Sequence, residues 1–145
     1  KECQCGNKGC LEAVANVNNL LEKVTSLENF SDNISLKEVA KLYRDGHSEI
    51  ETIIRKEARY VATGLINIVN TFNPEVIIIG GDIKVFGDKF LQEVKSFIEN
   101  TIFSYYLDKI NLYYNNLDQD EKLRGAGLLV IDRFFEKPYR VIDFS

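Results

Sequence analysis

The chain has 145 residues, of which 45% are hydrophobic. That fraction can build one folded domain with a core, so the composition argues against disorder. The net charge of −4 argues against the chain itself being a nucleic-acid-binding surface, because phosphate binding needs a basic field. No apolar run approaches the roughly 20 residues that span a bilayer, and no signal peptide is visible. With no Met and only two residues before its first Cys, the chain is expected to be a piece of a longer protein.

The first part of the chain is expected to be helical. Apolar residues at helical spacing predict a helix over residues 11–24, and the polar residues 28–33 predict a loop. Ser35 and Glu38 then have the spacing of a capping box, in which each side chain binds the other residue's backbone N–H. We therefore expect a second helix to start at this point.

A longer amphipathic helix is predicted over residues 48–72 from the apolar residues along one of its faces. Ser48 and Glu51 repeat the capping-box spacing at its start. Pro74 ends it, because the residue before a proline is pushed out of the helical region. Gly64 costs up to about 1 kcal/mol relative to alanine inside a helix, so we expect a neighbouring element to approach closely there.

The rest of the chain mixes strands and helices. The β-branched run 76–79 predicts a central parallel strand covered on both faces, and residues 110–114 predict a second strand. Helices are expected over residues 88–102 and 125–135, with a polar loop at 115–122. The expected core residues of the last helix are Leu128, Leu129, Ile131 and Phe135, and the expected edge strand of the tail is 140–142. The pattern predicts an α/β fold in which helices outnumber strands.

Three cysteines lie within eight residues, at Cys3, Cys5 and Cys10, and the chain has no others. A disulfide between Cys3 and Cys5 would close a very small, strained ring, and any pairing leaves one thiol over. Shared binding of a soft metal is the simpler explanation, with zinc the default. Gly6 and Gly9 let the chain fold back so that the sulfurs face one point. We expect about one structural zinc per chain, with its missing ligand upstream of this sequence.

Two other interpretations of the cluster stay open. The cysteines could be three free thiols on a loop, or they could hold a catalytic zinc with an open position, for which only Glu12 lies nearby as a base. His47, the one histidine, is interpreted as a residue just before a helix cap and not as a ligand. Clustered thiols with none elsewhere fit a reducing cytosol, so we expect a cytoplasmic protein.

Three further positions could bind a ligand. Glu12 is either a first-turn acid that favours the helix dipole or a carboxylate, held by the metal loop, that accepts hydrogen bonds from ligand hydroxyls. Gly80 and Gly81 follow the strand at 76–79, where α/β sheets bind ligands, although a plain turn would also use them. Gly125 and Ala126 open the last helix in a similar way, and tight helix packing is the first explanation for them.

Together these features resemble the ROK family of sugar kinases and sugar-responsive repressors over nearly the whole chain. Residues 3–12 are similar to the family's Cys-x-Cys-Gly-x-x-Gly-Cys-x-Glu zinc signature, and residues 73–81 to its strand-and-diglycine segment. Residues 124–127 stand where members commonly have Gly-Ala-Ala, with Gly127 in place of the usual alanine. The resemblance implies the C-terminal lobe of an actin-like (ribonuclease H-like) ATPase fold, which is helix-rich with a partial, mostly parallel sheet.

The resemblance also implies an organisation and a set of sites. The chain divides into a zinc loop (1–12), an α/β lobe (13–135) and a C-terminal tail (136–145). The implied zinc ligands, joined in the family by an upstream histidine, are Cys3, Cys5 and Cys10. Glu12 would contact sugar hydroxyls. In kinase members the residues near the nucleotide would be Gly80, Gly81, Gly125 and Ala126. The family's phosphate-binding loop and catalytic aspartate are missing, so no catalytic residue is expected in this chain.

Three functions follow as hypotheses. The first is a sugar-sensing transcriptional repressor, of which this chain is the effector-binding and oligomerisation part. The second is an ATP-dependent sugar kinase that uses ATP and Mg²⁺, and the third is a zinc-stabilised interaction module. The expected partners are a sugar or sugar-phosphate effector, a second copy in a homodimer or higher oligomer, and DNA only through an absent N-terminal domain; no membrane is expected. We favour the repressor, because the tail from Arg133 onward resembles that of repressor members.

Overall fold

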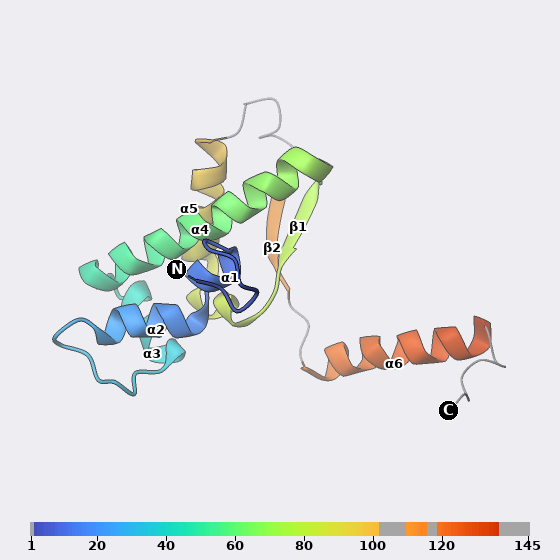
Figure 1. Ribbon diagram of the computed structural model, residues 1–145, viewed down its shortest axis with the longest axis horizontal. Coiled ribbons are helices and arrows are strands. Elements are labelled where there is room, and N and C mark those ends of the chain that lie inside the picture. Colours follow the sequence, from blue (N-terminus) through green and yellow to red (C-terminus); the bar gives the residue numbers. More distant parts are fainter. Residues whose placement is uncertain (1, 102–109, 116–118, 137–145) are drawn as a thin grey trace. The chain divides into compact units, whose positions relative to one another are not determined.

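The computed structural model describes residues 2–101, 110–115 and 119–136, and the chain forms two units, Lys1–Tyr114 and Asn115–Ser145. The second unit contains one helix, α6 (Gln119–Glu136). The first unit contains, in chain order, α1 (Leu11–Val14), α2 (Val17–Thr25), α3 (Leu36–Arg44), α4 (Ser48–Phe72), β1 (Val76–Ile79), the 3₁₀ helix η1 (Asp82–Phe86), α5 (Gly87–Glu99) and β2 (Asn111–Tyr114) (Figure 1). The prediction of a helix-rich α/β fold is confirmed.

The long helix α4 is the centre of the first unit, and it packs against α5, α2 and α3. It spans the predicted residues 48–72. The helix ends there because Asn73, the residue before Pro74, leaves the helical conformation and adopts a left-handed one with φ of 45°. Its apolar face is shorter than predicted, since Ile68 and Phe72 at its end are exposed. The largest fully buried side chains of the unit include Val24, Val39, Tyr43, Ile50, Ile54, Val69, Phe90 and Val94.

β1 and β2 form a two-stranded parallel sheet in which Ile77 lies opposite Leu112. η1 and α5 connect the two strands, so that they form a βαβ unit, and both strands were predicted. Ile77 and Leu112 are buried with the helices, whereas Val76 and Ile78 are 51% and 66% exposed. The prediction that the first strand is covered on both faces is therefore wrong for this unit, because helices cover one face only.

The two predicted capping boxes have different outcomes. At Ser35 the box is present: the hydroxyl accepts from the Glu38 N–H, and the Glu38 carboxylate accepts from the Ser35 N–H. The prediction of a capping box at Ser48 is wrong, because His47 occupies the N-cap position of α4 and makes no side-chain hydrogen bond there. The Glu51 carboxylate instead pairs with Lys89 of α5, so a tertiary ion pair replaces the local cap.

The single helix predicted over residues 11–24 is also wrong, because the chain breaks it into α1 and α2. Asn16 caps α2, and its side-chain oxygen accepts from the Asn19 N–H at 2.9 Å. The Asn16 amide group donates to the Glu12 carbonyl at 2.7 Å. An asparagine side chain that bonds nearby backbone groups competes with helix continuation, and this explains the break.

The second unit differs from its prediction at both ends of the helix. α6 begins at Gln119, inside the predicted polar loop, so Gly125 and Ala126 lie within the helix and do not open it. The four residues predicted as core are more than half exposed: Leu128, Leu129, Ile131 and Phe135. Within its own unit α6 is the one described element, so these side chains have no second layer to pack against there, and their place in a core stays a prediction. The predicted edge strand at 140–142, like Ile102 of the predicted helix, lies outside the described residues.

In the described parts of the chain, no helix is both long enough and apolar enough to cross a membrane.

Candidate functional site

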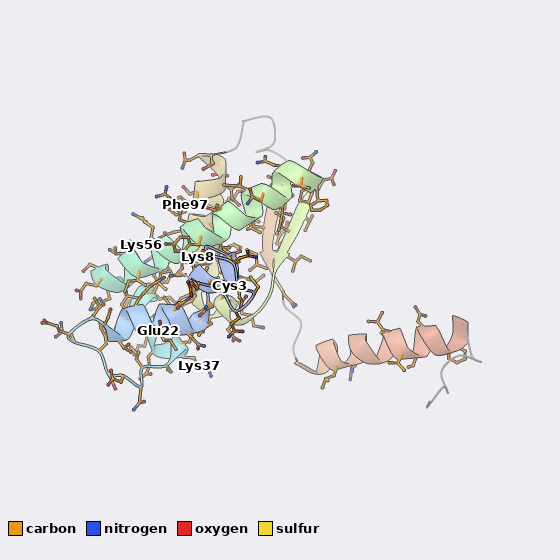
Figure 2. The ribbon with its side chains drawn as sticks, in the orientation of Figure 1. Cys3, Lys8, Glu22, Lys37, Lys56 and Phe97 are labelled. Atoms are coloured by element: carbon orange, nitrogen blue, oxygen red, sulfur yellow. The ribbon has the colours of Figure 1, made fainter. Side chains whose placement is uncertain are left out.

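The cysteines lie on a tight loop at the start of the chain. The Cys3 N–H donates to the Asn7 carbonyl at 2.8 Å, and the Gly6 N–H donates to the Cys3 carbonyl at 3.0 Å. Gly6 and Gly9 have φ of 84° and 77°, a left-handed backbone that glycine adopts without strain. Cys3 and Lys8 lie on this loop in Figure 2. The loop turns back on itself at each glycine, as the sequence predicted.

This fold-back brings the three sulfurs together. The Sγ atoms of Cys3, Cys5 and Cys10 all lie within 4.8 Å of one another, and the Cys5–Cys10 distance is 3.6 Å. All three are free thiols. Sulfurs around a tetrahedral ion with metal–sulfur bonds of about 2.3 Å are about 3.8 Å apart, so the cluster has the dimensions of a three-sulfur metal site. No other group of three or more ligand residues occurs in the part of the chain that the structure describes.

The loop also prepares one thiol for ionisation. The Asn7 backbone N–H, together with the neighbouring Cys3 and Cys10 thiols, lowers the pKa of Cys5 to about 7. Hydrogen bonding to Cys5 raises the pKa of Cys10, because the two close sulfurs share a proton and Cys5 loses its own first. A metal binds thiolates and not thiols, so the lowered pKa of Cys5 favours the form of this side chain that could bind a metal.

His47 is not part of this cluster. Its ring packs edge-on against Phe30, with ring centroids 5.3 Å apart, and its buried Nδ1 has no hydrogen-bond partner among the described residues. His47 is itself the N-cap residue of α4, one position later in the helix start than the sequence predicted.

Glu12 follows the sulfur loop directly. Cys10 is the N-cap residue of α1, so Glu12 lies in the first turn of a helix that begins at one of the three cysteines. The neighbouring Leu11 packs on α4 at Gly64: a Cβ atom added at Gly64 would lie 2.8 Å from Leu11 Cδ2. The close approach predicted at Gly64 is thus confirmed, and α1 is the element that makes it.

Two asparagines fix α1 from its other end. Besides the bond from Asn16 to the Glu12 carbonyl, the Asn19 amide group donates to the Ala13 carbonyl at 2.6 Å. Asn19 is only 5% exposed, so this bond is shielded from water. The sequence prediction missed both residues, although an N-cap asparagine followed three residues later by a second polar residue is a recognisable helix start.

Glu12 stands between two hollows. One, of about 320 Å³, lies beside the sulfur loop and is also lined by Cys3 and Asn18. The other, a cleft of about 610 Å³, is also lined by Gly80 and Gly81, which follow β1. We call this second hollow the Glu12 cleft. The structure therefore brings together two of the predicted ligand positions, the acid after the cysteines and the diglycine after the strand.

The remaining predicted positions do not join this site in the structure. Gly125 and Ala126 belong to α6 in the second unit, and their proximity to a nucleotide stays a prediction.

Two solved structures share this fold. The first is the crystal structure of a ROK family transcriptional regulator, a homolog of the E. coli MLC protein, with a TM-score of 0.77 and 26% identity over 89% of this chain and 35% of that one. The second is the ROK hexokinase from Thermus thermophilus, with a TM-score of 0.70 and 27% identity over 91% of this chain and 45% of that one. The fold is thus that of a lobe of an actin-like sugar kinase or repressor, as predicted.

The sequence comparisons give the family. The family model described as the ROK family matches residues 1–133, so the chain belongs to the ROK family. The xylose repressor of Bacillus subtilis (strain 168) is 27% identical over 135 residues, which are 93% of this chain and 34% of the repressor. The chain therefore spans about a third of the length of this curated relative.

The asparagine pair gives a stability prediction with a matched control. Asn19→Ala should lower the free energy of unfolding of the chain by about 1–2 kcal/mol, because it leaves the Ala13 carbonyl without its buried donor. Asn18→Ala changes the same residue type one position earlier, where the side chain is exposed, and should change the free energy by less than about 0.5 kcal/mol. Urea unfolding of both variants measures the difference. Equal effects would contradict the role given to Asn19.

Proposed function

We propose that the full-length protein is a sugar-responsive transcriptional repressor, and that this chain is its effector-binding and oligomerisation region. The observation that supports this most is the position of Glu12, which directly follows the sulfur loop and lines the cleft that contains Gly80 and Gly81. A carboxylate there can accept hydrogen bonds from several sugar hydroxyls at once. Similarity to a xylose repressor over 93% of the chain supports the regulatory role. DNA would be bound through a domain outside this chain.

We further propose that the loop binds one structural zinc ion through Cys3, Cys5 and Cys10. Thiolates are soft ligands that suit zinc, and the Cys5–Cys10 sulfur distance of 3.6 Å is close to the spacing of about 3.8 Å in a tetrahedral site. When bound, the ion supplies no chemistry to the sugar but cross-links the loop. A fourth ligand would come from the rest of the protein, where the family has a histidine. A reducing cytosol would keep these thiols available to the metal.

The zinc proposal predicts a metal content. The full-length protein, purified without chelator, should contain about one zinc per chain. Cys5→Ser should remove most of it, because two sulfurs cannot complete the site. Glu2→Gln is the matched control, since Glu2 is in the same loop and, among the described residues, pairs with the exposed Lys8 at 3.6 Å. Elemental analysis measures the metal, and a Cys5→Ser protein with full zinc would contradict the assignment.

A sugar kinase is the second candidate. The observation that favours it is the position of Gly80 and Gly81 on the Glu12 cleft, together with the similarity to a ROK hexokinase. In this case ATP and Mg²⁺ would bind beside the two glycines, with Gly125 and Ala126 nearby. The catalytic base would come from the part of the protein outside this chain, so this chain alone should transfer no phosphate.

One experiment separates the two candidates. The full-length protein should bind the DNA upstream of its own gene, release it when sugar is added, and show no sugar-dependent ATP turnover. Glu12→Gln should raise the half-maximal sugar concentration for release at least about tenfold, because hydrogen bonds to a charged group contribute about 1.5–3 kcal/mol. Glu28→Gln, in the loop after α2, is the control and should leave release unchanged. Sugar-dependent ATP turnover without DNA binding would favour the kinase.

A further inference from the structure

A groove between α4 and α5 is positively charged, although the net charge of the whole chain is −4. Its volume of about 670 Å³ falls within the range of about 300–1,000 Å³ that is typical of ligand pockets. We call it the α4–α5 groove, and it has no lining residue in common with the Glu12 cleft. Four cations and two acids among its lining residues leave a net charge of +2. These charged residues are Glu51, Arg55, Lys56, Arg59, Lys89 and Glu93.

Both acids of the groove are already paired with cations. Lys89 of α5 forms an ion pair with Glu51 of α4, and its Nζ also donates to the Tyr43 carbonyl at 3.1 Å. Glu93 accepts from the Arg55 Nε through one carboxylate oxygen and from the Tyr43 hydroxyl through the other, each at 3.3 Å. Two of the four cations are therefore balanced by acids, and the remaining two carry the net charge of the groove.

The series of ion pairs along the groove ends at Arg59. Each of the two pairs joins residues 38 positions apart, and they lie one helical turn from each other on both helices. The same spacing matches Arg59 of α4 with Phe97 of α5, which also lines the groove and offers no negative charge. Figure 2 labels Phe97 and Lys56. The exposed side chains of Arg59 and Lys56 form no hydrogen bond or ion pair with any residue that the structure describes.

Three cations are grouped within little more than one turn of α4, at Arg55, Lys56 and Arg59. Residues three and four positions apart are neighbours on a helix surface, so these side chains line the same part of the groove. Arg55 binds Glu93 through Nε, and because a guanidinium has five N–H donors, it keeps donors for a ligand. Guanidinium groups bind phosphate oxygens through parallel hydrogen bonds, and a lysine adds a point charge. The group therefore has the chemistry of a phosphate site.

We propose that the α4–α5 groove binds a phosphate monoester, and that its phosphate contacts Arg55, Lys56 and Arg59. A phosphate monoester carries a charge of about −1.5 to −2 at pH 7, which matches the net charge of the groove. The groove extends along α4 to the hydroxyl groups of Ser48 and Thr52, so it has room and polar groups for the organic part of the ester. A sugar phosphate and a nucleotide share this chemistry. The proposal does not depend on the function proposed for the Glu12 cleft.

Isothermal titration of the full-length protein with D-glucose 6-phosphate and with AMP tests the proposal and separates a sugar phosphate from a nucleotide. At least one of the two esters should bind. Arg59→Gln and Lys56→Gln should each weaken its binding at least about tenfold, because each removes a charged donor to the phosphate. Lys37→Gln is the matched control, since it also removes one exposed positive charge but lies on α3, outside the groove. It should leave the affinity for the ester unchanged.

The outcomes also distinguish the groove from the Glu12 cleft. Glu12→Gln should leave ester binding unchanged, and both groove variants should unfold at the wild-type temperature, because they change exposed side chains. The proposal is overturned if neither ester binds, or if an ester binds and neither Arg59→Gln nor Lys56→Gln weakens it. It is also overturned if a hexaglutamate peptide binds the groove more tightly than both esters, which would assign the groove to an acidic protein segment. None of these results bears on DNA release by sugar, the test of the proposed function.

Discussion

The candidate site depends on the convergence of three sulfurs at the start of the chain. Two left-handed glycines and the Cys3–Asn7 hydrogen bond bring the thiols to within 4.8 Å of one another, before any metal is considered. Because Cys10 is also the N-cap residue of α1, the position of this sulfur and the position of Glu12 two residues later are set together. An ion held by the sulfurs would therefore restrain the carboxylate as well.

Contacts with the rest of the first unit fix the position of α1 beside the Glu12 cleft. A helix of four residues has little stability of its own, so its position depends on its contacts. Leu11 packs where α4 has a glycine, and Asn16 and Asn19 bind the carbonyls of Glu12 and Ala13. Gly80 and Gly81, which directly follow β1, also line this cleft. The cysteine loop, α1 and the residues after β1 thus meet around the Glu12 carboxylate.

Local sequence signals predicted this structure well where local contacts decide it. The capping box at Ser35, the end of α4 before Pro74 and the fold-back at Gly6 all depend on residues close in sequence. The box at Ser48 was mispredicted because Glu51 is taken by Lys89, which is 38 residues away. Burial of both strand faces and of the apolar side of α6 depends on which layers are present, and a hydrophobic pattern alone does not contain that information. Glu57 of α4 is buried, lines the Glu12 cleft and pairs with Lys23 of α2; its burial was not predicted, because its partner and most of the cleft lie on other elements.

The most direct test of this account is X-ray absorption at the zinc edge of the full-length protein. The account predicts one zinc environment with three sulfur neighbours at about 2.3 Å and one lighter nitrogen or oxygen neighbour. A bound zinc with no sulfur shell, or with oxygen neighbours alone, would show that the converging cysteines do not hold the ion and would contradict the account.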